Sequence, residues 1–173
     1  MKKNQYILKS ILTECDKHLR RMHYAIGKVA HLFPLTKEVL LKLNEEEIAY
    51  FDQSIYRFTK LQDAIGQKLF KAVLVILDED IANKAAIDIF NRLEQLEIIE
   101  NYENWKELRD LRNELAHEYE EAENETTEKL NTLFEKKSDL EKYLNDIRNY
   151  LSKRGLDTGY LMEDNGIENG SRV

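Results

Sequence analysis

The residues most suited to chemistry lie in one short segment, RDLRNELAHEYEEA, residues 109–122. It places an arginine, a histidine and a tyrosine at Arg112, His117 and Tyr119, in a chain with only 4 histidines. An arginine can hold a phosphate through two hydrogen bonds, and a histidine can exchange a proton near neutral pH. On a helix, Arg112 and His117 are separated by a rise of about 7.5 Å, which a bound phosphate can bridge. The spacing is therefore compatible with phosphate chemistry.

The helical geometry of this segment divides its side chains into two sets. Counting about 100° per residue, three leucines share one face and predict the buried stripe of the helix: Leu108, Leu111 and Leu115. Arg112 lies at one margin of that stripe, together with Trp105 and Tyr119. His117 lies on the far side, beside Asn113, and is not expected in the core. We therefore expect a partner surface or groove that extends from the margin of the stripe to the exposed side.

Arg112 has no acidic residue three or four positions away on its own helix. The absence of such a partner favours an interaction outside the helix. A structural interpretation stays open beside it. In that interpretation Arg112 lays its stem along the margin with its head in water, and His117 is solvated or loosely paired with a neighbouring glutamate. The spacing alone leaves both interpretations open.

The composition predicts the fold that must carry this segment. A chain of 173 residues can bury one core of ordinary size, and a second full domain is not expected. There are only 1 proline and 6 glycines, and three of the glycines fall in the last fifteen residues. The rest is dominated by Leu, Glu, Lys, Ala and Ile, which is typical of long helices. An all-α fold is therefore predicted.

Charge, cysteine content and hydropathy narrow the partners and the location. The net charge of −7 argues against tight non-specific binding to nucleic acid. A local basic groove around KHLRR, residues 17–21, stays open, although such a run is usually a solvated helix face. The single cysteine, Cys15, excludes a disulfide scaffold. No apolar run reaches the ~20 residues of a membrane-spanning helix, and no signal peptide is recognised. We expect a cytoplasmic protein, not bound to a membrane, with no cofactor and no metal site.

Apolar residues at steps of three and four predict the helices, and capping residues predict their ends. The predicted helices span residues 6–33, 37–43, 45–77, 81–99, 105–122 and about 126–154. The predicted start and stop residues are Thr36, Asn44 with Glu47, Asn104 with Glu107, Thr126 or Thr127, and finally Gly155. The sum is an antiparallel helical bundle of about five helices over residues 1–155, followed by a flexible C-terminal tail, residues 156–173.

The segment RNELAHEY, Arg112 to Tyr119, resembles the signature of the HEPN superfamily, in which an arginine, four residues, a histidine, one residue and a tyrosine follow each other. Within that superfamily it is most similar to the HepT-like toxins encoded beside a minimal nucleotidyltransferase antitoxin. The polar residue after the arginine, here Asn113, is also typical. Residues 50–70, YFDQSIYRFTKLQDAIGQKLF, resemble the long second helix of the same group. The resemblance covers most of residues 1–154.

The resemblance implies a homodimer whose two motif helices face each other, and a metal-independent ribonuclease of the HEPN type as its activity. Two copies of Arg112 and His117 would then line one cleft. His117 would act as general base or acid in attack by the ribose 2′-hydroxyl on the adjacent phosphorus, and Arg112 would stabilise the charge on the phosphoryl oxygens. Asn113 would orient the scissile group or the histidine. The family also implies that a nucleotidyltransferase antitoxin silences the toxin by AMPylation of Tyr119.

Two other function classes stay open. In the first, the same bundle is a non-catalytic binding or regulatory partner of a nucleotidyltransferase. In the second, it is a structural adaptor that dimerises through apolar stripes. The acidic net charge favours both, because an enzyme acting on RNA gains association rate from a wider positive field. The motif favours the ribonuclease.

Overall fold

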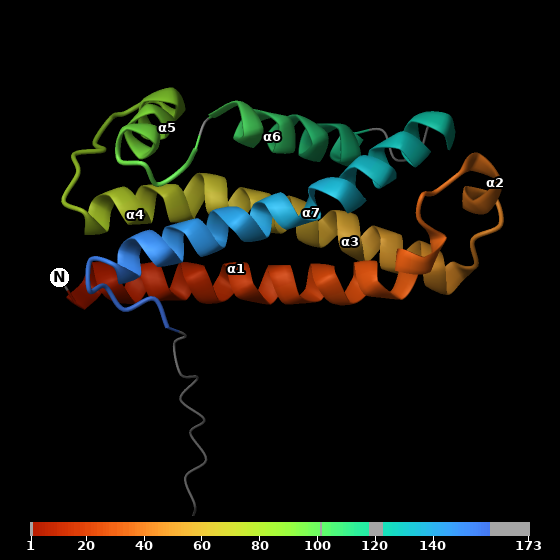
Figure 1. Ribbon diagram of the computed structural model, residues 1–173, viewed down its shortest axis with the longest axis horizontal. Helices are drawn as coiled ribbons and strands as arrows, with labels where there is room; N and C mark the ends of the chain where they lie inside the picture. The colour runs from red at the N-terminus through yellow and green to blue at the C-terminus, as the bar shows by residue number, and fades with distance from the viewer. Residues whose placement is uncertain (1, 101, 118–122, 160–173) are drawn as a thin grey trace, which may run out of the picture.

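The computed structural model describes residues 2–100, 102–117 and 123–159, and these ranges form helices and loops with no strand (Figure 1). The α-helices are α1 Lys2–Val29, α2 Lys37–Leu40, α3 Glu45–Asp63, α4 Phe70–Ile76, α5 Ala86–Gln95, α6 Tyr102–His117 and α7 Glu123–Ser152. A 3₁₀ turn, Ala30–Leu32, follows α1, and a π-helix, Ala64–Leu69, joins α3 to α4. The predicted all-α helical bundle is confirmed. Within the described ranges, no helix combines the length and apolarity needed to span a membrane.

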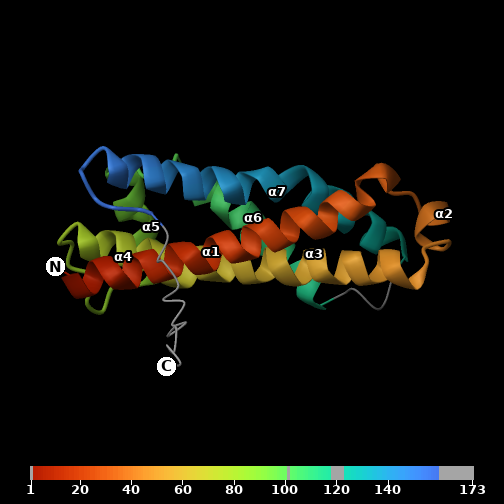
Figure 2. The same cartoon turned by 90° about the horizontal axis from the view of Figure 1, so that it is seen from below.

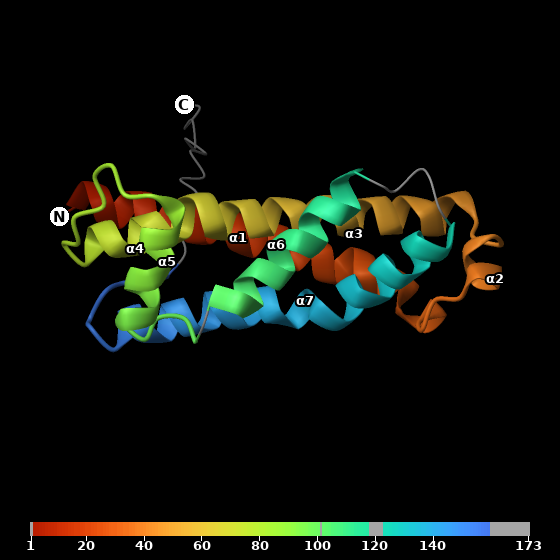
Figure 3. The same ribbon diagram turned by 90° about the horizontal axis from the view of Figure 1, so that it is seen from above.

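The long helices form the body of the molecule, and α6 lies across it. The helix α1, the continuous rod of α3 and α4, and α7 run along the long axis (Figure 1). Figure 3 shows α6 starting beside α7 and crossing obliquely until its last turns lie over α3. The short helices α2 and α5 lie at opposite ends of the bundle. This arrangement brings the C-terminal half of α6, which carries the motif, against the middle of the α3–α4 rod.

The starts of α2 and α3 confirm their predicted caps. The Thr36 hydroxyl accepts a hydrogen bond from the backbone N–H of Val39 at 3.3 Å. At α3 the Asn44 side chain accepts from the Glu47 N–H at 2.9 Å, and the Glu47 carboxylate accepts from the Asn44 N–H at 2.9 Å. This reciprocal pair satisfies two backbone donors that the helix start leaves free. The α3 boundary was therefore readable from side-chain types alone.

The predicted helix over residues 45–77 is one continuous rod, but it contains the π-helix that the sequence pattern does not reveal. At Gly66, in the middle of the π-helix, a Cβ atom would lie 2.7 Å from Cζ2 of Trp105 on α6. The missing side chain is what lets the indole ring of Trp105 pack directly on the rod. Gly66 thereby sets how closely α6 approaches.

The prediction of a helix over residues 81–99 is wrong at both ends, because α5 covers only Ala86–Gln95. At the start, the Asp80 and Asp88 carboxylates accept hydrogen bonds from loop N–H groups, and Asn83 has a left-handed φ of 59°. At the end, Glu97 adopts a φ of 56° and the N–H of Ile98 bonds back to the Leu93 carbonyl at 2.9 Å. Short polar side chains thus stabilise a non-helical start, and a backbone hydrogen bond closes the end of the helix.

The predicted starts of the last two helices are also wrong. We expected Asn104 to cap α6, but α6 begins at Tyr102, whose N–H donates to the Glu94 carboxylate. The cap therefore comes from a residue on α5, and sequence proximity could not reveal it. The predicted caps of α7, Thr126 and Thr127, lie inside the helix and are buried.

The end of α7 agrees with the prediction. Gly155 has a φ of 72°, the left-handed conformation that glycine adopts without strain, and the Leu156 N–H bonds back to the Leu151 carbonyl at 3.1 Å. Beyond it, Asp157 pairs with Lys9 on α1. Residues 160–173 lie outside the described part, so the predicted division into residues 1–155 and 156–173 remains a prediction.

The main hydrophobic core is built from α1, the α3–α4 rod, α5, α6 and α7. A group of aromatic rings at its centre surrounds Trp105: Phe70 at 4.8 Å, Tyr143 at 5.2 Å and Phe90 at 6.0 Å between centroids. A smaller cluster, Val29, Leu35, Phe51 and Leu130, fills the α2 end. The larger core anchors α6 along its whole buried face.

Candidate active site

The buried face of α6 is the stripe that the sequence predicts. Leu108, Leu111 and Leu115 are all buried. Trp105 departs from the prediction, which placed it at the margin, because only 1% of its surface is exposed. Its ring occupies the space above Gly66, where the helices approach closely enough to enclose it. The N-terminal half of α6 is therefore fixed by aromatic packing, which gives the motif residues farther along a rigid base.

The head of Arg112 does not lie in water, as it would in the structural interpretation that the sequence left open. Its Nη2 donates to both carboxylate oxygens of Asp63 on α3, at 2.8 and 3.0 Å. Only 27% of the Arg112 side chain and 23% of the Asp63 side chain are exposed. The expectation of a partner outside the helix is correct in kind, but the partner belongs to the same chain. The guanidinium is held in one orientation over the α3–α4 rod.

Asn113 contributes to the same arrangement. Its Oδ1 accepts a hydrogen bond from Nη1 of Arg112 at 2.8 Å. Nε of Arg112 is buried and has no hydrogen-bond partner within the described residues. Two neighbours thus fix the guanidinium from opposite ends while part of its donor capacity stays unused. The side chain of Asn113 thus contacts the arginine, and its role in orienting the scissile group or the histidine remains a prediction.

His117 is the last residue described in α6, and its side chain lies outside the described part of the structure. Its backbone position is helical, which keeps it five residues from Arg112 and about 7.5 Å farther along the axis. Tyr119 lies outside the described residues altogether. The structure therefore shows Arg112 and Asn113 in contact and gives His117 its place on the same helix.

Asp63 is the site residue that sequence reasoning missed. It is the last residue of α3, directly before the π-helix, and it also accepts a hydrogen bond from Gln67 at 3.3 Å. Two signals were present in the sequence. An acid sits among the buried positions Gln62, Ala64 and Ile65, and an arginine elsewhere lacked a local partner. Pairing Asp63 with Arg112 requires knowing that α6 crosses the α3–α4 rod at this point.

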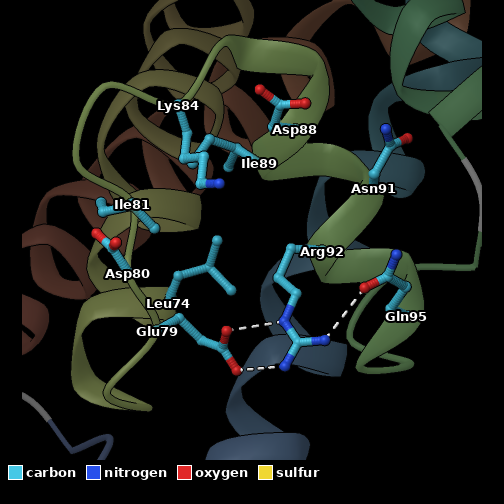
Figure 4. Close-up of a pocket in the computed structure, with 10 residues that line it drawn as sticks. All are labelled: Leu74, Glu79, Asp80, Ile81, Lys84, Asp88, Ile89, Asn91, Arg92 and Gln95. Carbon is cyan, nitrogen blue, oxygen red and sulfur yellow. Dashed lines mark hydrogen bonds and ion pairs between the residues drawn. The ribbon is translucent and has the colours of Figure 1, made fainter.

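Two further observations limit the chemistry of the surroundings. Within the described ranges, no group of three or more histidine, cysteine or acidic residues is arranged to hold a metal ion. A hollow of about 430 Å³ lies between α5 and the loop before it (Figure 4). There Arg92 donates to both oxygens of Glu79 at 2.8 and 2.6 Å, which holds the pKa of Glu79 below its usual range. Glu79 and Arg92, which both line this hollow, are therefore paired with each other.

The fold and the site together define a class: an all-helical bundle in which an arginine on an oblique helix is fixed by an acid on the central rod. The comparison with known families is consistent with this class. The family model described as Ribonuclease HepT-like matches residues 40–152, about two thirds of the chain. The chain therefore belongs to the ribonuclease HepT-like family, and the suspected resemblance is confirmed. No curated protein and no solved structure matches it.

The matched range includes the α3–α4 rod, α5, α6 and the whole of α7, so it contains both Asp63 and Arg112. It does not include α1, although α1 supplies Leu8, Leu12 and Met22 to the main core. The family match thus covers the part of the bundle that carries the motif, and α1 completes the core around it.

Proposed function

We propose that this chain is a toxin-type endoribonuclease that cleaves RNA without a metal ion, using Arg112 and His117. Membership of the ribonuclease HepT-like family supports the class of activity. The observation that supports placing this activity on α6 is the fixed guanidinium of Arg112. Asp63 and Asn113 hold Arg112 in one orientation, on the helix that also carries His117. A charged group that is already oriented needs little reorganisation when a phosphate arrives.

The proposed reaction is transesterification at phosphorus. The ribose 2′-oxygen forms a bond to the adjacent phosphorus, and the bond from phosphorus to the 5′-oxygen of the next nucleotide breaks. His117 takes the proton of the 2′-hydroxyl, and the protonated histidine of a second subunit gives a proton to the departing 5′-oxygen. Arg112 stabilises the negative charge on the non-bridging oxygens. The products are a 2′,3′-cyclic phosphate and a 5′-hydroxyl.

In this mechanism Asp63 is a positioning residue. It fixes the guanidinium through two hydrogen bonds, and its charge offsets part of the positive charge of Arg112. Replacing it by asparagine keeps the size of the side chain and removes the charge. Since misplacement of a catalytic group by about 1 Å costs on the order of a hundredfold in rate, we expect Asp63→Asn to lower kcat between about tenfold and a hundredfold. An unchanged rate constant of single-turnover cleavage in Asp63→Asn would show that Asp63 has no positioning role.

The partners follow from the same proposal. A second copy of the chain would place two motif helices in one cleft, and a nucleotidyltransferase antitoxin would silence it by transferring AMP to Tyr119. The hydroxyl of Tyr119 loses its proton and attacks the α-phosphorus of ATP, pyrophosphate leaves, and the adduct adds negative charge two residues after His117 in the sequence. Mass spectrometry of the chain, purified with and without a co-expressed antitoxin, tests this step through the mass of the added AMP. An unmodified Tyr119 in a silenced complex would contradict it.

The deciding experiment compares growth after induced expression of the wild type, Arg112→Ala and His117→Ala. Two matched controls are available: Arg109→Ala, one turn earlier on α6 with 43% of its side chain exposed, and His31→Ala, an exposed histidine far from the motif in sequence. We expect the wild type and both controls to stop growth and to produce RNA with new 5′-hydroxyl ends. Both motif variants should lose these effects while keeping their circular dichroism spectra. Purified wild type should also cleave in the presence of EDTA.

One observation favours a second candidate function, a non-catalytic binding partner of a nucleotidyltransferase. Arg112 is already engaged by an acid of its own chain, as an arginine with a structural role would be. This candidate predicts equal growth and intact RNA for all five proteins, with the wild type expressed free of any antitoxin. It also predicts that His117→Ala leaves binding to the nucleotidyltransferase unchanged. Those results would overturn the ribonuclease proposal.

A further inference from the structure

A groove between α1 and α3 gathers arginines and tyrosines from both helices. It is a hollow of about 450 Å³, with Arg20, Arg21 and Tyr24 on the α1 side. Tyr50 and Arg57 line the α3 side. Figure 2 shows the two helices side by side. Among the described residues, no carboxylate lines this groove, although the chain as a whole carries a net charge of −7. The local charge is thus opposite to that of the molecule.

The three arginines of the groove are not neutralised within the described part of the chain. None of Arg20, Arg21 and Arg57 forms an ion pair with a carboxylate described here, whereas Arg112, Arg92 and Arg148 do. Arginines that share one groove without a carboxylate repel each other, and a bound anion relieves that repulsion. The KHLRR segment is therefore more than a solvated helix face, because it meets a third arginine from another helix.

Arg57 is held in place without losing its charge. Its guanidinium lies 5.0 Å from the centroid of the Tyr56 ring, and its Nη1 lies 3.2 Å from Nδ1 of His18. Burial and the positive charge of Arg57 lower the pKa of His18, so the ring is neutral near pH 7 and accepts a hydrogen bond from the arginine. Nε of Arg57 is buried and has no partner among the described residues. The contacts orient the group but do not neutralise it.

Exposed aromatic rings flank these charges. Tyr24 is 62% exposed and Tyr56 is 49% exposed. The Tyr24 ring packs edge-on against the Tyr50 ring, with 6.3 Å between the centroids. Exposed rings next to arginines are the combination that binds single-stranded nucleic acid, because bases stack on the rings while the arginines contact phosphates. An acidic protein segment would use the arginines and would gain little from the rings.

The groove also connects to the proposed site of cleavage. Tyr56, Lys60 and Asp63 are spaced by four and three residues and share one face of α3. Arg57 is six residues from Asp63, a rise of about 9 Å. Nζ of Lys60, between them, lies 5.7 Å from the Tyr56 ring centroid. A strand that leaves the groove along this face reaches the acid that holds Arg112.

We propose that the groove between α1 and α3 binds single-stranded RNA beside the cleavage site, with Arg20, Arg21 and Arg57 on its phosphates and Tyr24 and Tyr56 stacked on its bases. This inference rests on the proposed ribonuclease function for its substrate and on the groove for its location. It gives α1, which lies outside the family match, a part in substrate binding. The occupant is a flexible single strand rather than a duplex, because paired bases cannot stack on tyrosine rings.

The first test measures binding of a fluorescein-labelled 12-nucleotide 2′-O-methyl oligouridylate, which cannot be cleaved at the 2′-oxygen, by fluorescence anisotropy at several salt concentrations. Arg20→Gln with Arg21→Gln removes two phosphate contacts. We expect about a tenfold or greater loss of affinity, and a fall of about 1.4 in the slope of log K against log salt. The matched control replaces another adjacent basic pair, Lys153→Gln with Arg154→Gln at the end of α7. Its affinity and slope should stay those of the wild type.

The second test separates stacking from charge. Tyr24→Leu should lower the affinity between about fivefold and a hundredfold and leave the salt slope unchanged, because a base–ring contact releases no counterions. Tyr6→Leu is the matched control, since Tyr6 is also on α1 and is 63% exposed. It should bind as the wild type does. These side chains are exposed, so the variants should fold, and circular dichroism melts verify that they do.

Three results would overturn the inference. Groove variants that bind RNA as the wild type does would show that RNA does not use the groove. A loss of affinity in the Arg20→Gln, Arg21→Gln variant without any loss in Tyr24→Leu would show that bases do not stack in the groove. Binding of fluorescein-labelled polyglutamate that depends on Arg20 and Arg21 as strongly as RNA binding does would assign the groove to an acidic protein segment. Cleavage of an unmodified RNA is measured in parallel. Normal cleavage by the groove variants would support the ribonuclease function and overturn RNA binding in the groove. Binding that depends on the groove, without any cleavage by the wild type, would support the groove and overturn the ribonuclease function.

Discussion

The contact between Gly66 and Trp105 gives the sharpest prediction of stability. A Cβ atom at Gly66 would lie 2.7 Å from Cζ2 of Trp105 and 3.5 Å from Cε2, and the shorter distance is closer than non-bonded carbon atoms can approach. The indole ring cannot move away easily, because it is 1% exposed and Phe70 and Tyr143 lie against it. Gly66→Ala must therefore displace α6 from the α3–α4 rod or force the ring out of its position.

The magnitude is a balance of two terms. Overpacking of a well-packed core costs about 1–3 kcal/mol. Replacing a glycine inside a helix by alanine gains about 0.5–1 kcal/mol. We expect Gly66→Ala to lower the free energy of unfolding by roughly 1 kcal/mol, and by no more than about 2.5 kcal/mol.

Gly27 provides the matched control. It is also inside a helix, α1, but among the described residues nothing lies within 4 Å of the point that a Cβ atom would occupy there. Gly27→Ala should therefore raise the free energy of unfolding by about 0.5–1 kcal/mol. Because the helix-propensity gain is common to both substitutions, the difference between the two variants measures the overpacking cost alone.

Urea unfolding followed by fluorescence is the assay, since Trp105 is the single tryptophan of the chain. Circular dichroism gives the second probe that a two-state transition requires. In a Trp105→Leu background, Gly66→Ala should lose most of its cost, because the clashing atoms are gone. Two alanine variants that change stability in the same direction by similar amounts would refute this account of the helix contact.

Three further predictions concern single side chains. Asn44→Ala should lower the free energy of unfolding by about 1 kcal/mol in urea titrations, because it removes the capping box with Glu47; an unchanged midpoint would contradict this. The pKa of His18 is lowered in the folded chain, so the unfolded chain binds more protons and stability should fall as pH falls below about 6.5. His18→Gln should flatten that part of the profile, and an unaltered slope would count against the assignment. Burial raises the pKa of Cys15 to about 12, so thiol reagents at about pH 8 should label it only as the chain unfolds, and fast labelling without urea would disprove it.

The sequence was a good guide wherever a helix depends on its own residues. Periodicity predicted α1, the α3–α4 rod, α6 and α7, and the caps at Thr36 and Asn44 were found as expected. It failed where a residue from another element decides. Glu94 on α5 caps α6, a contact that a pattern within one helix cannot contain. Periodicity also failed at the start of α5, where the local side chains of Asp80 and Asp88 accept hydrogen bonds from N–H groups before the helix.

The same distinction holds for the site. The stripe of leucines on α6 could be predicted because it repeats with the period of the helix. The partner of Arg112 could not, because Asp63 lies 49 positions away on a helix that α6 crosses. Trp105 was placed at the margin because a helix angle takes no account of a glycine on the opposing helix. Both errors have one cause, the close approach of α6 to the π-helix.

That π-helix also determines which way the second half of the rod faces. If every residue turned about 100°, the buried positions of α3 and those that follow the π-helix would point in directions about 100° apart, the turn of one residue. The buried positions before it are Phe51, Ser54, Phe58, Leu61 and Gln62, and those from its last residue onward are Leu69, Phe70, Val73 and Leu74. The wider π turn takes up this one residue, so that both halves of the rod bury their apolar sides in the same bundle. The rod therefore behaves as a regular helix that carries one inserted residue. Deleting a residue from this turn would leave the composition almost unchanged and rotate the whole of α4 away from the core.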